Sequence, residues 1–123
     1  MKKKNINYGK WFTEEEFMCK CGCYTTRMDQ KFVDTLNKLR DLLDRPMKIN
    51  SGYRCPAHPE SVKYPGSSHI KGVAVDIACE DSGYRRRVIR MAEDLWVNRI
   101  GISGKFLHLD LDVNKAPAYW HYN

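Results

Sequence analysis

The chain has 123 residues, of which 42% are hydrophobic and 29% are charged, values that are typical of one folded globular domain and exclude an intrinsically disordered chain. Its apolar runs fall far short of the ~20 residues of a membrane-spanning helix, and the basic N-terminus lacks the apolar segment of a secretory signal. The net charge of +6 favours an anionic partner, namely nucleic acid, a membrane or the cell wall, although scattered lysines and arginines are equally typical of a solubilising surface.

The N-terminal part of the chain predicts two helices. Thr13–Glu16 has the spacing of a capping box, which predicts a short helix that ends near Met18. A loop follows, and Asp29 can cap a second helix that Pro46 ends. The residues expected to face the core from this second helix are Phe32, Val33, Leu36, Leu39, Leu42 and Leu43, which recur at helical spacing.

The C-terminal part of the chain predicts several strands and one helix. Strands are expected at residues 47–51, 73–78, 99–102 and 106–113. Asp81 or Ser82 can cap a helix from Tyr84 to about Val97. Its inward residues are expected to be Val88, Met91, Ala92, Leu95 and Trp96. The segment Cys55–Ser67 is rich in proline, glycine and serine, which predicts a loop. Together these elements predict an α+β domain with helices packed on one face of a small antiparallel sheet.

Two of the predicted strands carry ionisable side chains on the face opposite their apolar residues. Asp76 lies between two alanines of the strand at 73–78, and His69 lies just before that strand. In the strand at 106–113, His108, Asp110 and Asp112 share one face. The other face is formed by Leu107, Leu109, Leu111 and Val113. Buried carboxylates are rare unless they are paired or bind a metal, and both imidazole and carboxylate groups bind zinc. His69, Asp76 and His108 therefore predict a metal site, with ordinary hydrogen-bonded histidines as the alternative.

The five cysteines leave two interpretations open. Their odd number argues against a complete set of disulfides. Cys19, Cys21 and Cys23 could coordinate a structural zinc ion together with Cys55. However, C-x-C-x-C is not the usual C-x-x-C zinc spacing, and free thiols in a reducing cytoplasm are the alternative.

Three segments, in this order, resemble the M15 metallopeptidases: Ser51-Gly-Tyr-Arg54-Cys-Pro, Ser68-His-x-x-Gly72-x-Ala-x-Asp76 and His108-x-Asp110. This family contains the D-Ala-D-Ala carboxypeptidases and L-Ala-D-Glu endopeptidases of bacterial cell walls and phage lysins, and it shares a fold superfamily with the hedgehog signalling domain. The resemblance runs from about residue 12 to residue 120 and includes the Glu-Phe-x-Cys-x-Cys-Gly opening of one branch of the family, its subfamily A. It implies a hedgehog/D-Ala-D-Ala peptidase-like fold in a single domain over residues 1–123, with a flexible basic N-terminus at residues 1–10.

The resemblance also implies roles for individual residues. His69, Asp76 and His108 match the ligands of one catalytic zinc ion. Arg54 matches an arginine that contacts the substrate, where its planar guanidinium suits a carboxylate or a carbonyl that gains negative charge. Ser51 and Tyr53 match substrate-binding motif positions. Ser51 is expected to support Arg54, and turn packing is the alternative role for both residues.

The general base is less well defined, because the sequence departs from the carboxypeptidase pattern. That pattern has an acidic residue three positions before the last histidine, where this chain has Lys105. Asp110 is the candidate base instead, since it lies two residues from His108, or about 6.6 Å along a strand. Its alternative role is to orient His108. The remaining candidates for the base are Asp112, His121 and His58.

The leading interpretation is a zinc-dependent peptidase, either carboxypeptidase or endopeptidase, that hydrolyses a stem peptide of peptidoglycan. Without a recognisable secretory signal, a monomeric phage or prophage lysin fits best: it is made in the cytoplasm and reaches the cell wall after release. Neither nucleic-acid binding nor membrane insertion is expected. One rival is a catalytically silent zinc-binding module that binds cell wall or a protein partner. The other rival is a basic nucleic-acid-binding domain, which would leave Arg54, Asp76 and Asp110 without roles.

Overall fold

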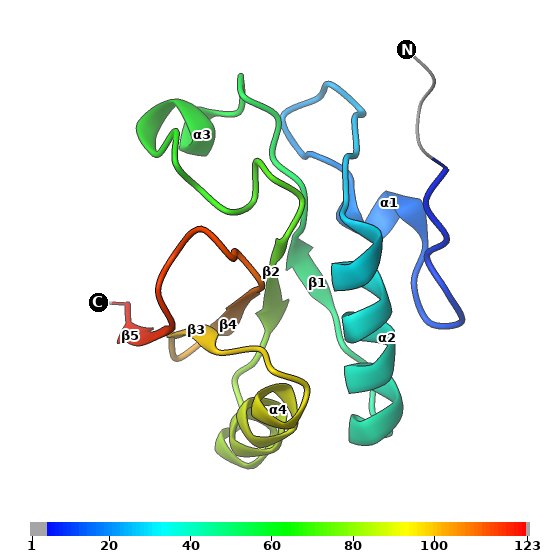
Figure 1. The fold of residues 1–123 in the computed structure, drawn as a ribbon, viewed down its shortest axis with the longest axis vertical. Helices are drawn as coiled ribbons and strands as arrows, with labels where there is room; N and C mark the ends of the chain where they lie inside the picture. The colour runs from blue at the N-terminus through cyan, green and yellow to red at the C-terminus, as the bar shows by residue number, and fades with distance from the viewer. Residues whose placement is uncertain (1–4, 123) are drawn as a thin grey trace.

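A computed structural model describes residues 5–122 and shows the predicted α+β fold (Figure 1). Its helices are α1 (Glu14–Phe17), α2 (Gln30–Leu43), α3 (Pro59–Lys63) and α4 (Ser82–Asp94). Its strands are β1 (Ile49–Ser51), β2 (Ala74–Ala78), β3 (Arg99–Ile102), β4 (Phe106–Asp110) and β5 (Ala118–His121). Within the described residues, none of the helices has the length and apolarity that crossing a bilayer requires.

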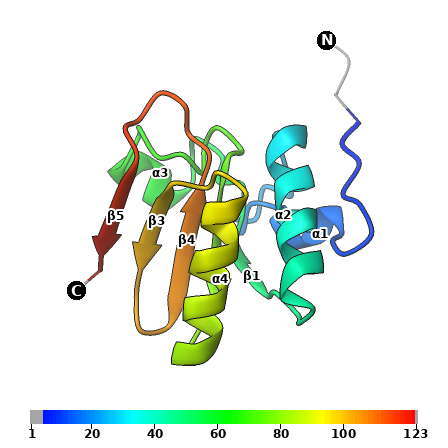
Figure 2. The same cartoon turned by 60° about the horizontal axis from the view of Figure 1, so that its bottom comes forward.

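The two long helices cover one face of the sheet. Figure 2 shows α4 in front of the sheet and running alongside β4, with α2 beside it, whereas α3 lies behind the sheet. The fully buried side chains of α2 and α4 pack against those of β2, β3 and β4; among them are Phe32, Leu36, Val88, Ile77, Ile100 and Leu107. Because this core occupies one face, polar side chains on the other face of the same strands are free to build a site.

The helices begin and end where their capping residues dictate. Asp29 accepts a hydrogen bond from the amide of Phe32 at 3.0 Å and so caps α2. Asp44, with a φ of +51°, ends α2 in the left-handed conformation before Pro46 is reached. Asp81 caps α4 in the same way, through the amide of Tyr84 at 2.7 Å.

Two residues predicted to face the core from the long helices do not do so. Leu42 is 49% exposed, because it falls at the edge of the apolar stripe of α2. Trp96 is 84% exposed, because α4 has already ended at Asp94 and the backbone turns with a φ of +67° at Trp96. The helical spacing therefore includes Leu42, beyond the buried face of α2, and Trp96, beyond the end of α4.

The sheet has the strand order β1-β2-β4-β3-β5. All neighbours are antiparallel except β5, which pairs in parallel with β3. The sheet is therefore mixed, because the C-terminal tail, which was not predicted as a strand, returns to extend the β3 edge. In addition, β4 ends at Asp110 and Val113 is 93% exposed, so the prediction of a strand to residue 113 was too long.

The segment predicted as a loop at residues 55–67 contains the short helix α3. Pro59 at its first turn and the His58 side chain, which accepts from the amide of Glu60 at 3.0 Å, start this helix. The predicted flexible N-terminus lies partly outside the described residues, at residues 1–4. Within the described part, Asn7 and Gln30 exchange hydrogen bonds of 2.8 Å and 2.7 Å, which join this segment to α2.

Candidate metal centre

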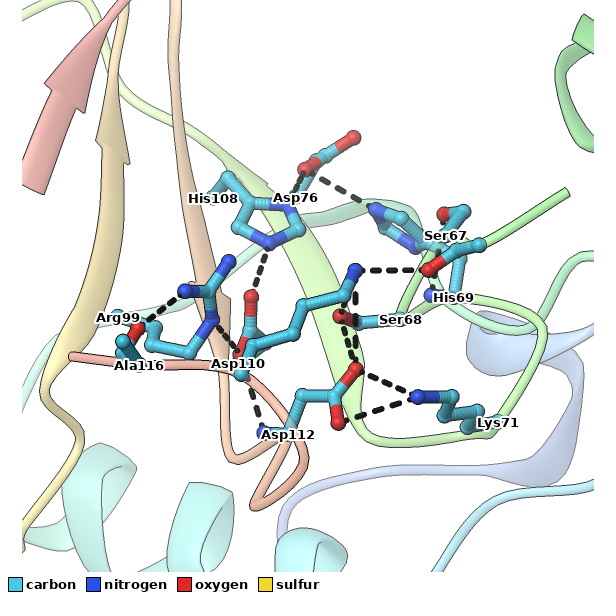
Figure 3. A network of polar contacts seen from close by, with 12 residues as sticks. Ser67, Ser68, His69, Lys71, Asp76, Arg99, His108, Asp110, Asp112 and Ala116 are labelled. Atoms are coloured by element: carbon cyan, nitrogen blue, oxygen red, sulfur yellow. Dashed lines mark hydrogen bonds and ion pairs between the residues drawn. The ribbon is translucent and has the colours of Figure 1, made fainter. Parts of the chain in front are cut away.

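Two paired strands and one loop bring the three predicted metal ligands together. The register of β2 and β4 places Asp76 directly opposite His108, so both side chains lie on the same face of the sheet. His69 reaches this face from the loop before β2. One donor atom from each residue lies within 4.8 Å of the others, and Figure 3 shows both imidazole rings directed toward the Asp76 carboxylate.

A glycine shapes the turn that carries His69. Gly72 has a φ of +72°, and a Cβ at this position would lie 1.9 Å from the carbonyl oxygen of Arg27, so only glycine fits. The carbonyl of Gly72 also accepts a hydrogen bond from the amide of Asp29 at 2.9 Å. The loop before β2 is thereby packed against the start of α2, which explains why a glycine follows His69 at this spacing.

Hydrogen bonds fix which nitrogen of each imidazole can bind a metal. His69 Nδ1 lies 2.7 Å from the carbonyl oxygen of Gly52, and because a carbonyl only accepts, Nδ1 carries the proton. His69 Nε2 is then left facing Asp76 Oδ1, 3.4 Å away. His108 Nε2 donates to Asp110 Oδ2 at 2.8 Å, and its Nδ1 faces Asp76 Oδ1 at 3.0 Å. Two imidazole nitrogens and one carboxylate oxygen thus converge, which fits a zinc site with three protein ligands and an open fourth position.

The Asp76 carboxylate favours a cation at this point, whereas protons on the imidazoles oppose one. Burial acts to raise the pKa of Asp76, but hydrogen bonds from His108 and His69 outweigh it and bring the pKa well below its usual value. Burial acts to lower the pKa of His108, but hydrogen bonds to Asp110 and Asp76 raise it overall. A metal that binds here must displace protons from imidazole, so its affinity increases as the pH rises.

Asp110 lies behind His108, away from the nitrogen that faces Asp76. Its side chain is fully buried, and its Oδ1 accepts from Arg99 Nε at 2.8 Å and from the Asp112 amide at 3.0 Å, while Oδ2 accepts from His108. Burial acts to raise the pKa of Asp110, but these contacts lower it overall. Both oxygens are therefore engaged. Of the two roles predicted for Asp110, its contacts support the orientation of His108 and do not support transfer of a proton from water.

The other predicted bases also have different neighbours. Asp112 is buried, accepts from Ser68 Oγ at 2.7 Å and pairs with Lys71 at 3.1 Å, so it joins the loop before β2 to the end of β4 (Figure 3). His58 caps α3, and His121 is an exposed residue of β5. None of these three lies among the described residues that line the cleft next to the candidate ligands.

Arg54 is held at the edge of the site. Its Nε donates to Ser51 Oγ at 3.1 Å, as predicted, and its Nη2 donates to Asp76 Oδ2 at 3.2 Å. Tyr53, by contrast, is 5% exposed and belongs to the hydrophobic core, and its amide donates to the carbonyl of Phe17 at 2.9 Å. Tyr53 thus has the packing role, while Arg54 presents its guanidinium beside the metal ligands.

The three candidate ligands and Arg54 line an open cleft of about 840 Å³. One wall comes from α3 and the loop that follows it, and the other from β5 and the residue after it. The side chains on these walls include Glu60, Lys63, Tyr64, Trp120 and Tyr122, and Lys115 lines the cleft from the loop before β5. A cleft of this size and shape admits a short peptide.

A sequence model of the peptidase M15 family matches residues 10–110, which include Arg54 and all three candidate ligands. The chain belongs to the peptidase M15 family. Members of this family are zinc metallopeptidases, and the donors of His69, Asp76 and His108 fit that metal. Comparison with curated proteins gives no match.

Some residues of the M15 cleft were not predicted from the sequence. The Trp120 ring lies 5.3 Å from the His108 ring, and the Arg99 guanidinium lies 5.1 Å from the centre of the Trp120 ring. Tyr122 also lines the cleft, and burial raises the pKa of its hydroxyl, which therefore stays protonated at neutral pH and can donate a hydrogen bond. The period-two spacing of Trp120 and Tyr122 is the signal in the sequence that indicates a strand here.

Proposed function

We propose that the chain is a zinc-dependent peptidase that hydrolyses a peptide bond in the stem peptides of peptidoglycan. The observation that carries this proposal is the convergence of His69 Nε2, His108 Nδ1 and an Asp76 oxygen in an open cleft beside Arg54. Either a carboxypeptidase or an endopeptidase is compatible with this arrangement. We further propose that the chain is a monomeric lysin of phage or prophage origin, which acts on the cell wall after release from the cytoplasm.

The ligands and their hydrogen-bond partners would hold the metal in one geometry. Zinc at such a site supplies Lewis-acid chemistry, which polarises a carbonyl and lowers the pKa of water. His69 is oriented by the Gly52 carbonyl and His108 by Asp110, so both imidazoles are fixed before any metal or substrate arrives.

Arg54 has the geometry to bind an anionic part of the substrate. Ser51 and Asp76 hold its guanidinium at the cleft, where it can pair with a carboxylate of the stem peptide or with charge that develops on the scissile carbonyl. Tyr122, as a neutral hydroxyl on the other wall, can donate a second hydrogen bond. These residues would position the peptide bond against the three ligands.

The proton acceptor follows by elimination among the carboxylates that line the described cleft, which are Glu60, Asp76 and Asp110. Asp76 faces both imidazoles, and both oxygens of Asp110 are engaged behind His108. Glu60 on α3 is the remaining one, and we assign it as the first candidate for the base. Glu60→Gln is expected to lower kcat at least ~100-fold while zinc affinity stays unchanged.

The experiment that tests the proposed function is incubation of the purified protein with intact muropeptides, followed by mass spectrometry. A new free amine is expected with zinc present, and its position identifies the cleaved bond. A chelator should abolish the reaction, added zinc should restore it, and Asp76→Asn should be inactive. Absence of any new amine with every metal tested would refute the proposal.

One observation favours a second candidate function, a zinc-binding module that binds cell wall or a protein partner without cleavage. Lys105 replaces the acidic residue of the carboxypeptidase pattern and lies in the turn between β3 and β4, at the other end of β4 from Asp110. Binding of zinc-loaded protein to purified sacculi without release of muropeptide fragments would support this module and exclude the peptidase.

A further inference from the structure

A second cluster of metal-ligand side chains lies outside the cleft, in the loop between α1 and α2. Cys19, Cys21 and Cys23 come from this loop, and Cys55 comes from the turn after β1. Figure 1 shows the two segments side by side. The four Sγ atoms all lie within 4.8 Å of one another.

The sulfur atoms lie at distances that suit a shared ion better than a disulfide. Cys21 Sγ is 3.5 Å from Cys19 Sγ and 3.5 Å from Cys55 Sγ. A disulfide needs about 2.05 Å. Four thiolates at about 2.3 Å from a tetrahedral zinc ion are about 3.8 Å apart, because the edge of a tetrahedron is about 1.63 times its centre-to-corner distance.

We propose that Cys19, Cys21, Cys23 and Cys55 bind a structural zinc ion through four thiolates. Tetrahedral sets of four sulfurs are the ligands that zinc prefers in closed structural sites. The amide of Cys55 donates to Cys19 Sγ at 3.3 Å, a contact that stabilises negative charge on a metal-bound sulfur. Cys19 and Cys55 are buried and Cys21 and Cys23 are exposed, so the ion can enter from the solvent side.

The ion would tie the turn that carries Arg54, a residue of the cleft, to the α1–α2 loop. Cys55 directly follows Arg54, and the same turn contains Gly52, whose carbonyl orients His69. This turn is also joined to the N-terminal segment by the bond from the Tyr53 amide to the Phe17 carbonyl at 2.9 Å. A zinc ion between Cys55 and the α1–α2 loop therefore makes the position of Arg54 depend on this loop. The metal site itself does not depend on the proposed peptidase activity.

The test is the zinc content of the purified chain, measured by plasma mass spectrometry after extensive dialysis. Two zinc ions per chain are expected. Asp76→Ala should remove the ion in the cleft and keep the cysteine site, whereas Cys23→Ser should remove the cysteine-bound ion and keep the other. Cys79→Ser is the matched control, because Cys79 is buried elsewhere, and it should keep both ions.

X-ray absorption of the zinc in Asp76→Ala identifies the ligands independently of activity and of any cysteine variant. Four sulfurs at about 2.3 Å are expected. Asp76→Ala loaded with cobalt in place of zinc should give an intense thiolate-to-metal charge-transfer band. Adding Cys23→Ser to this variant should weaken the band. Iron in place of zinc, nitrogen or oxygen ligands only, or a cysteine disulfide found by alkylation and mass spectrometry would each overturn the proposal. Failure to cleave muropeptides would leave these results unchanged, so the two proposals fail separately.

Discussion

His108 is held at both ring nitrogens by carboxylates. Asp76 Oδ1 lies 3.0 Å from Nδ1, and Asp110 Oδ2 lies 2.8 Å from Nε2. A neutral imidazole has only one N–H group, so a metal ion on Nδ1 would leave the proton on Nε2, where Asp110 accepts it. Arg99 and the amide of Asp112 hold Asp110 in turn. A chain of buried hydrogen bonds therefore holds His108, a candidate metal ligand, from behind.

This arrangement predicts that Asp110→Asn weakens metal binding. An asparagine amide at this position can donate to Nε2, which favours the tautomer with the proton on Nδ1, the nitrogen that the metal needs. We expect zinc affinity to fall about 10–100-fold, measured by competition with a chelating dye. If Asp110 were instead the general base, Asp110→Asn would keep wild-type zinc affinity and lose only turnover.

Asp112→Asn is the matched control for that measurement. Asp112 is the next carboxylate on the same segment, but its partners are Ser68 and Lys71. Its loss should leave zinc affinity within about twofold, since side chains that do not contact a ligand contribute little to ligand orientation. An equal fall in both variants would mean that general destabilisation, not the tautomer, causes the loss.

At the residue scale, the sequence was sufficient to predict which candidate ligands converge and insufficient to predict what supports them. The convergence of Asp76 and His108 could be predicted because a strand alternates its faces, so each polar side chain lies opposite the core, whereas His69 reaches them from the loop before β2. The role of Asp110 could not be resolved, because it depends on which ring nitrogen each carboxylate meets. That is a matter of side-chain rotamers rather than of spacing.

The strand β5 forms one wall of the cleft because it packs closely over a glycine of β3. A Cβ at Gly101 would lie 2.6 Å from Trp120 Nε1 and 2.6 Å from the Tyr122 ring. Gly101→Ala should therefore displace β5 and move Trp120 away from His108. We expect the free energy of unfolding to fall by about 1–3 kcal/mol, as in other overpacked sites, measured by urea denaturation.

Gly104→Ala provides the control for this prediction. Gly104 lies in the β3–β4 turn, and a Cβ there would meet nothing within 4 Å. The same substitution should change stability there by less than about 0.5 kcal/mol. A similar loss in both variants would show that the contact with β5 is not responsible.

At the element scale, long periodic segments could be predicted and short ones could not. α2 and α4 each present an apolar stripe over several turns and begin at an aspartate cap, so their existence followed from the pattern. α3 has five residues, too few to show a period, and β5 depends on pairing with β3, which is distant along the chain. Such pairing is a property of the folded molecule, which explains why the cleft wall formed by β5 was not predicted from the sequence.

Asp112 connects two parts of the molecule, since it joins the loop of His69 to the end of β4. Burial acts to raise its pKa, but bonds from Ser68 and Lys71 lower it overall below the unfolded value of about 3.9. A lowered pKa stabilises the fold above the unfolded pKa, and this contribution is lost as the pH falls through the folded pKa. At pH 7, Asp112→Asn should therefore lower the free energy of unfolding by about 1–2 kcal/mol.

The difference between wild type and Asp112→Asn should shrink as the pH is lowered below about 4, because protonated wild type has lost the same charge. Urea denaturation at several pH values checks this, with a chelator present throughout so that loss of metal in acid does not contribute. A difference that stays constant from pH 7 to pH 3 would contradict the assignment.

At the scale of the whole molecule, the charge of +6 should attract an anionic substrate to the cleft. Lys63 lies on the cleft wall, whereas Lys31 is an exposed residue of α2 on the other side of the sheet. We expect kcat/KM on muropeptides to fall about 3–10-fold between about 20 and about 500 mM salt, as screening shortens the range of attraction.

Lys63→Glu and Lys31→Glu change the net charge equally, so they separate the effect of a charge at the cleft from the effect of the net charge. At low salt, Lys63→Glu should lower kcat/KM more than Lys31→Glu does. At high salt, kcat/KM of both variants should approach the wild-type value. Equal effects would show that net charge alone acts, and no dependence on salt would show that substrate capture does not rely on long-range attraction.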